Sequence, residues 1–240
     1  MQTSIPEKSL RDYVCTQVNT LFPDGNPISS IDLEKAVTEA LMRLEYCFQK
    51  IRVRRYCLDG QANFGHLYSD HYLMFLWFLS NSLWRGNGRS DAYNKIYLLN
   101  KCLHGFDCAF DTALPDIFIV IHGVGTVLGK ASYSNFLAVY HGCTVGQTQG
   151  IYPRLGIGVG IGAGAAIIGR SCVGDFSSVG AGCAVLNTDI AANTSVLQGS
   201  DGKLAIRGGH VAAIAKEYFL DEFLYAATYS NGNTTDLRQT

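Results

Sequence analysis

Aliphatic side chains recur at every sixth position through the second half of this chain. Twelve of the thirteen residues on this spacing are aliphatic. The spacing runs through Ile121, Val127, Tyr133, Val139, Val145, Leu155, Ile161, Ile167, Val173, Val179, Val185, Ala191 and Leu197. The helical period is lost after Pro115, so the repeat predicts a coiled chain in which one residue in six points into a narrow interior.

Glycine and other small residues fill much of each six-residue unit. Glycine follows the aliphatic residue directly at Gly146, Gly156, Gly162, Gly174 and Gly180. Such residues suit corners where the backbone turns tightly or adopts a positive φ. The stretch GIGVGIGAG imitates a nucleotide-binding turn, but no switch from strand to helix follows it and the six-residue step continues through it. We therefore expect neither a dinucleotide site nor a flexible linker here.

The repeat has one interruption. Val145 and Leu155 are ten residues apart instead of six, so the intervening QTQGIYPR is expected to leave the coil as a loop. Loops carried on a rigid repeat are frequent places for function.

The first half of the chain has a helical period. Apolar residues advance in steps of three and four over residues 33–51, with Ser29 or Ser30 as the expected cap. Two further helices are predicted, over 69–85 and over 90–104. Each opens on a Ser-Asp pair taken as a cap signal and stops at a glycine, Gly86 or Gly105. Residues 1–106 therefore form a predicted helical domain.

Composition restricts the partners of this 240-residue chain. Apolar residues make up 48% and charged residues 16%, which favours contacts between subunits. The 19 basic and 20 acidic residues give a net charge of −1, so no nucleic acid is expected to bind. Eight cysteines without a C-x-x-C pair favour reduced thiols over a zinc or redox motif. The first residues lack a signal-peptide pattern and the longest apolar run, 72–79, is too short for a membrane span, so we expect a cytoplasmic protein.

These six-residue units resemble the left-handed parallel β-helix of the hexapeptide-repeat acyltransferases, which has three units per coil. More narrowly, a helical domain followed by IHGVGTVLGKASYSNFLAVYHGCTVGQTQG and YPRLGIGVGIGAGAAIIG resembles the serine acetyltransferases. The resemblance implies an α+β chain with a helical domain over 1–106, a β-helix over 107–209, and a C-terminal helix with a polar tail over 210–240.

The resemblance also implies two catalytic residues. The family's proton-accepting histidine lies in an H-x-x-G-x-x-x-G motif, which HGVGTVLG reproduces from His122. The family's histidine-orienting aspartate lies fifteen residues upstream, where this chain has Asp107. A fifteen-residue separation also brings two side chains into adjacent layers of such a coil, so we expect Asp107 to contact His122. An acceptor hydroxyl would then attack the thioester of acetyl-CoA directly, with no covalent enzyme intermediate.

The family's acetyl-CoA groove lies between the β-helices of a trimer and is lined by small residues. The matching positions are Gly146, Thr148, Ala163, Gly164, Ala181 and Gly182. No metal is expected. A homotrimer is expected, and pairing of two trimers stays open. The chain ends in threonine where relatives that bind cysteine synthase end in isoleucine, so that complex is not expected.

The chain departs from the serine acetyltransferases where those enzymes hold the amino acid. Ile151 and Tyr152 replace an Arg-His pair before Pro153, and Ile121 replaces an acid before His122. Without these charged side chains, the site is expected to bind the ammonium and carboxylate groups of a zwitterion poorly. We therefore expect a neutral hydroxyl acceptor, such as a sugar of a surface polysaccharide or its precursor, in preference to free serine.

Four residues are candidates to contact this acceptor: His141, Tyr152, Arg154 and Asp70. A packing role for His141 is equally open. Arg154 keeps a true serine O-acetyltransferase as an alternative. Two alternatives belong to other functional classes. One is a noncatalytic trimeric scaffold on this fold. The other is a β-helical carbonic anhydrase, which would need a close H-x-x-x-x-H pair within the repeats, whereas the sequence has this spacing only at His66 and His71, before the repeats begin.

Overall fold

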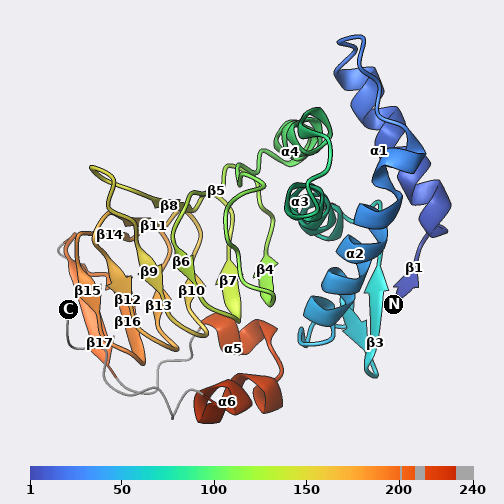
Figure 1. The fold of residues 1–240 in the computed structure, drawn as a ribbon. Helices are drawn as coiled ribbons and strands as arrows, with labels where there is room; N and C mark the ends of the chain where they lie inside the picture. The colour runs from blue at the N-terminus through green and yellow to red at the C-terminus, as the bar shows by residue number, and fades with distance from the viewer. Residues whose placement is uncertain (201, 209–213, 231–240) are drawn as a thin grey trace.

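The computed structural model describes residues 1–200, 202–208 and 214–230 (Figure 1). A helical half is followed by a parallel β-helix, and two short helices pack beneath both. The helical half contains β1 (Gln2–Thr3), α1 (Glu7–Leu21), α2 (Ser30–Phe48), β2 (Cys57–Leu58), β3 (Gln61–Phe64), α3 (Ser69–Arg85) and α4 (Ser90–His104). Among the described residues, no helix combines the length and apolarity needed to cross a membrane.

The three predicted helices are present, but two of the predicted caps are wrong. Ser29 caps α2 in a capping box with Asp32, as its sequence indicates. Helices α3 and α4 instead begin after Tyr68 and Arg89, and no side chain caps either of them. The Ser-Asp pairs lie inside the first turns, which frees the carboxylate of Asp70 for another contact.

Two features of the helical half had no counterpart in the sequence analysis. One is α1, which buries Leu10, Val14 and Val18 on one side of a largely polar helix. The other is a small sheet in the order β1-β3-β2, which pairs the first residues of the chain with Gln61–Phe64. Its strands are two to four residues long, so they carry little alternation.

The second half is a coil with three flat faces, as the repeat predicts. One face has the strand order β16-β13-β10-β7-β4, the second β14-β11-β8-β5 and the third β15-β12-β9-β6. Pairing within each of these faces is parallel, and β17 (Leu204–Gly208) adds an antiparallel strand to β16 at the end of the coil. The strands are β4 (Phe118–Val120), β5 (Val127–Leu128), β6 (Ser132–Tyr133), β7 (Leu137–Val139), β8 (Thr144–Gly146), β9 (Arg154–Leu155), β10 (Gly160–Ile161), β11 (Ala166–Ile168), β12 (Cys172–Val173), β13 (Ser178–Val179), β14 (Ala184–Leu186), β15 (Asp189–Ile190) and β16 (Thr194–Gln198).

The predicted interior is correct in the middle of the coil and wrong near its ends. Eight predicted positions are at most 2% exposed: Val139, Val145, Leu155, Ile161, Ile167, Val173, Val179 and Val185. In the first coil, however, Val127 is 40% exposed and Leu128 points inward with 1% exposure. In the last coil, Ile190 and Val196 are buried in place of Ala191 and Leu197. Small changes in coil length shift the side-chain alternation by one residue at each of these points.

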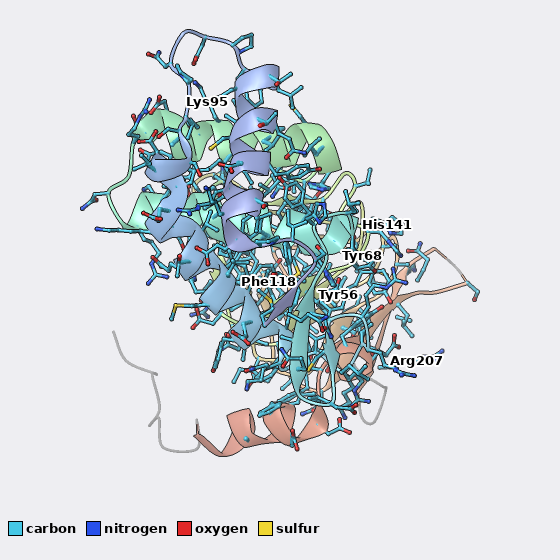
Figure 2. All side chains as sticks on the ribbon, turned by 90° about the vertical axis from the view of Figure 1, so that its right-hand side faces the viewer. Tyr56, Tyr68, Lys95, Phe118, His141 and Arg207 are labelled. Atoms are coloured by element: carbon cyan, nitrogen blue, oxygen red, sulfur yellow. The ribbon has the colours of Figure 1, made fainter. Side chains whose placement is uncertain are left out.

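The helical half and the β-helix share one hydrophobic core. The ring of Phe118 on β4 packs edge-on against Trp77 of α3 with 5.3 Å between ring centres. Figure 2 views the molecule from the helical side, where Phe118 lies behind the helices. Helix α3 is thus held directly against the first coil, which fixes the position of its N-terminal turn.

The C-terminal segment forms two helices instead of the single predicted one. These are α5 (Ile214–Tyr218) and α6 (Asp221–Ser230), with a fully buried Phe219 between them. The N–H of Arg52 donates to the carbonyl of Tyr218 at 2.8 Å, so this segment is tied to the helical half. The start of the predicted helix, at 210–213, and the predicted polar tail after residue 230 lie outside the described residues.

Candidate functional site

His122 lies on a two-residue insertion in the first coil. Val120 of β4 pairs with Val139 of β7, and Val127 of β5 pairs with Thr144 of β8. Val120 and Val127 are seven residues apart, whereas their partners Val139 and Thr144 are five residues apart. The first coil therefore contains two extra residues at this corner. The insertion bulges outward, and His122 adopts a left-handed φ of +54°. Its side chain is 72% exposed, so its imidazole is open to solvent.

Asp70 is the acidic side chain that meets this bulge. Its Oδ1 accepts a hydrogen bond from the backbone N–H of His122 at 3.1 Å. Its Oδ2 lies 3.9 Å from Nδ1 of the same histidine, and only 6% of the Asp70 side chain is exposed. The sequence predicts that Asp70 contacts the acceptor, and in the structure its carboxylate faces His122.

Burial and nearby positive groups act in opposite directions on Asp70. Desolvation raises the pKa of its carboxyl above the usual value, while the hydrogen bond from His122, its imidazole and the guanidinium of Arg55 oppose the rise. Arg55 lies over the ring of Tyr68 at 4.5 Å. The buried carboxylate in the first turn of α3 therefore lies near the exposed cation of Arg55 and the ring of Tyr68.

The predicted contact between Asp107 and His122 is not formed. The carboxylate of Asp107 instead accepts hydrogen bonds from Tyr97 Oη at 2.7 Å and Lys101 Nζ at 2.6 Å, both on α4. Burial raises the pKa of Asp107, but these two donors outweigh it and leave the pKa below its usual value. Among the described side chains, no hydrogen bond or ion pair joins Asp107 to His122. The spacing argument fails because the two extra residues carry His122 out of register toward α3.

His141 and four of the predicted coenzyme residues share one corner of the coil. Backbone N–H groups link successive layers: Gly142 donates to Val124, Gly164 to His141, and Gly182 to Ala163. This column therefore contains His141, Ala163, Gly164, Ala181 and Gly182, and it begins next to the bulge of His122. Gly164 and Gly182 have φ values of +70° and +69° and are exposed, with open space where a Cβ would stand. In Figure 2, His141 lies at the edge of the molecule.

The other two predicted coenzyme residues lie across the second face. Gly146 ends β8, and Thr148 follows it in the loop between β8 and β9. An antiparallel bridge between Thr148 and Ile151 closes this loop, and the N–H of Gly150 donates to Oε1 of Gln147 at 2.7 Å. The predicted loop is therefore present and internally braced.

Tyr152 and Arg154 do not meet His122 within one chain. Tyr152 is exposed at the corner between the second and third faces, and Arg154 is exposed at the start of β9 on the third face, whereas His122 lies at the corner between the first and second. The structure brings together His122, His141 and Asp70 on one side, and Thr148, Tyr152 and Arg154 on the other.

Two tyrosines near Asp70 were missed by sequence reasoning. The hydroxyls of Tyr140 and Tyr218 are hydrogen-bonded to each other, and Tyr140 directly precedes His141. Burial, the Tyr140 hydroxyl and the charge of Asp70 all raise the pKa of Tyr218. This pair joins residues 78 positions apart, and no local pattern indicates it. Within the described part of the chain, no three His, Cys, Asp or Glu side chains gather as a metal site would require.

Comparisons with known proteins point to one group of enzymes. No family model matches the chain. The serine acetyltransferase of Helicobacter pylori is 38% identical over 80 residues, which cover 31% of this chain and 47% of that protein. The serine acetyltransferase of Haemophilus influenzae is 33% identical over 116 residues, covering 45% and 42%. The chain thus spans about half the length of these relatives.

Solved structures extend the similarity to most of the fold. The serine acetyltransferase of Neisseria gonorrhoeae superposes with a TM-score of 0.64 at 20% identity, over 85% of this chain and 80% of that one. The Brucella abortus serine acetyltransferase in complex with coenzyme A gives 0.63 at 19% identity, over 88% and 85%. The chain therefore has the fold of the serine acetyltransferases, with a helical half before a parallel β-helix, and is similar to these enzymes in sequence over one third to one half of its length.

Proposed function

We propose that this protein is an acetyl-CoA-dependent O-acetyltransferase in which His122 is the general base. The observation that carries the proposal is the exposed imidazole of His122 on its two-residue bulge, beside the buried carboxylate of Asp70. The fold shared with the serine acetyltransferases, one of which was solved with coenzyme A, supports the same reaction class.

The proposed chemistry is a direct transfer. The imidazole of His122 takes the proton of an acceptor hydroxyl, and the hydroxyl oxygen attacks the thioester carbonyl of acetyl-CoA. The new ester bond forms as the carbon–sulfur bond breaks, and the imidazolium returns its proton to the departing thiolate of CoA. A backbone N–H at the glycine-rich corner is suited to stabilise the developing oxyanion. No covalent enzyme intermediate is required.

The corner column beside His122 fits a coenzyme with a long arm. Its residues carry no side chain larger than a methyl group at Ala163, Gly164, Ala181 and Gly182, so a ligand can reach the backbone there. We assign this column to acetyl-CoA, with Gly146 and Thr148 across the second face as further contacts.

A homotrimer would complete the acceptor site. In one chain, the loop with Tyr152 and Arg154 lies one corner away from His122, so a neighbouring β-helix must supply it if these residues touch the acceptor. The second face supports such packing, because Val127 and Leu186 are 40% and 56% exposed on it. The acceptor that we propose is a neutral sugar hydroxyl of a polysaccharide or its precursor, in preference to free serine, because Ile151 and Tyr152 offer no charge to a zwitterion.

A CoA-release assay with a panel of acceptors tests the function. Purified protein is incubated with acetyl-CoA and either serine, sugars or nucleotide sugars, and free thiol is measured. We expect release with at least one sugar acceptor and its loss in His122→Ala with an unchanged circular dichroism spectrum. The control is His66→Ala, which removes a histidine bonded to Ser4 in the N-terminal sheet region. Absence of release with every acceptor would contradict the proposal, and release with serine alone would correct the acceptor.

A further inference from the structure

We infer that Asp70, from the first turn of α3, is the positioning residue of His122. This inference rests on the proposed function of His122 as a base. It assigns to the helical half the part in catalysis that the sequence places at Asp107.

The contacts of Asp70 are directed at the histidine. Both of its carboxylate oxygens face His122, one at the backbone N–H and the other at the imidazole Nδ1. Asp70 is 4% exposed, and its side chain does not cap α3. A buried carboxylate is costly unless a hydrogen bond or a cation compensates it.

A second Ser-Asp pair in the chain provides the comparison. Ser90 and Asp91 open α4 as Ser69 and Asp70 open α3, and neither pair caps its helix. Asp91, however, is bound by the guanidinium of Arg89, with Nη2 2.7 Å from Oδ2, on the surface. Asp70 and Asp91 are each the second residue of their helix. Asp70 differs from Asp91 because it is buried and because its carboxylate faces a histidine.

The alternative partner, Asp107, is already engaged. Tyr97 and Lys101 donate to its two carboxylate oxygens, and leaving them would separate a charged pair. Asp70 needs no such exchange, because its Oδ2 is 3.9 Å from Nδ1, and a change of less than 1.5 Å would bring the pair to an ordinary hydrogen-bond distance. Catalytic hydrogen bonds often shorten only when substrate binds.

This geometry assigns a role to each imidazole nitrogen. Asp70 favours the tautomer with the proton on Nδ1, which leaves the lone pair of Nε2 free for the acceptor hydroxyl. As Nε2 takes the proton, the carboxylate stabilises the positive charge that develops on the ring. The other titratable groups that interact electrostatically with Asp70 are the guanidinium of Arg55 and the phenols of Tyr56 and Tyr218.

Asp70→Asn tests the inference, because its amide oxygen still accepts from the backbone N–H of His122 while the charge is lost. We expect kcat to fall about 100-fold with little change in KM for acetyl-CoA. The ¹⁵N shifts of His122 report the tautomer without turnover, and we expect Nδ1–H to predominate in the wild-type protein in alkaline buffer and to decline in Asp70→Asn. The signal of His122 is assigned by its absence in His122→Gln. The matched control is Asp91→Asn, which we expect to change neither quantity.

The outcomes separate this inference from the proposed function. A wild-type protein that releases no CoA contradicts the function, while the tautomer still tests the contact. Predominance of Nε2–H in the wild-type protein overturns the inference even if Asp70→Asn fails to fold. The inference is also overturned if Asp107→Asn lowers kcat and changes the tautomer of His122 while Asp70→Asn does neither.

Discussion

Gly123 lies directly against Leu73 of α3. A Cβ built on Gly123 would stand 2.4 Å from Cδ1 of Leu73 and 3.0 Å from Cγ1 of Val120, and real Cβ atoms do not approach other atoms as closely as the first of these distances. The residue after His122 is therefore fixed against the helix that carries Asp70. This contact sets how closely the bulge approaches α3.

Replacing Gly123 by alanine is expected to displace the bulge. Leu73 is 1% exposed and has little room to move, so overpacking should lower the free energy of unfolding by about 1 to 3 kcal/mol. It should also lower kcat more than KM for acetyl-CoA. Urea unfolding and the CoA-release assay measure the two effects. Gly208→Ala is the control, because its Cβ meets nothing within 4 Å. Equal stability of the two variants would show that the contact is less tight than the structure indicates.

Acid should destabilise the protein through two buried histidines. Desolvation lowers the pKa of His71 to about 3 and that of His104 to about 4. Their folded-state pKa values lie below the unfolded value near 6.5, so the unfolded chain binds more protons, and stability is lost as the pH falls through this window. Each histidine should remove about 2 kcal/mol of stability between pH 7.5 and pH 5.

Chemical denaturation at both pH values measures this loss. The ring of His71 packs among the aromatic rings of Phe48, Tyr56, Phe64 and Tyr68. In His71→Phe, a nontitrating ring takes this place, so the stability lost between pH 7.5 and pH 5 should be about half that of the wild-type protein. A wild-type protein equally stable at pH 7.5 and pH 5 would contradict the burial of both imidazoles.

The six-residue repeat predicts the coil because burial is strictly periodic there. Val139, Ile161 and Val179 pair with one another in successive layers, and each position is read from local spacing alone. The insertion around His122 changes the coil length by two residues without any visible break in the sequence. Val127 and Leu128 are both aliphatic, so the sequence pattern is satisfied whether Val127 or Leu128 points into the coil, and only the structure shows that Leu128 is the buried one.

The site was only partly predictable for the same reason. His122 stands in a local motif that the sequence displays, whereas its contact with Asp70 joins residues 52 positions apart in two different kinds of structure. The fifteen-residue spacing of Asp107 is a local count, and the bulge invalidates it. The Ser-Asp pair at the start of α3 predicts a cap because that is the usual role of such residues, but the helix begins directly after Tyr68 and the carboxylate of Asp70 contacts His122 of the β-helix.

Tyr152 should affect the acceptor and not the coenzyme. It is 48% exposed in the loop between β8 and β9, and the adjacent Ile151 is 47% exposed, so the two offer a matched comparison. If Tyr152 contacts the acceptor across a trimer interface, Tyr152→Ala should raise KM for the sugar about 10-fold. Ile151→Ala should change it little. Steady-state kinetics with each substrate varied in turn measures this, and equal effects of both variants on KM for acetyl-CoA would place the loop at the coenzyme instead.

The corner glycines should bind the coenzyme through their backbone. Gly182 and Gly202 share a left-handed φ, +69° and +76°, and a Cβ on either meets nothing within 4 Å. Alanine should therefore cost about 1 to 2 kcal/mol of stability at each position, because L-residues disfavour this conformation. Only Gly182 lies in the column beside His122, whereas Gly202 lies in the connection between β16 and β17, so only Gly182→Ala should also raise KM for acetyl-CoA, by about 10-fold. Urea unfolding of both variants tests the common cost, and kinetics tests the difference. If the two variants lose stability equally but bind acetyl-CoA equally well, the column is a structural corner and the coenzyme must lie elsewhere on the β-helix.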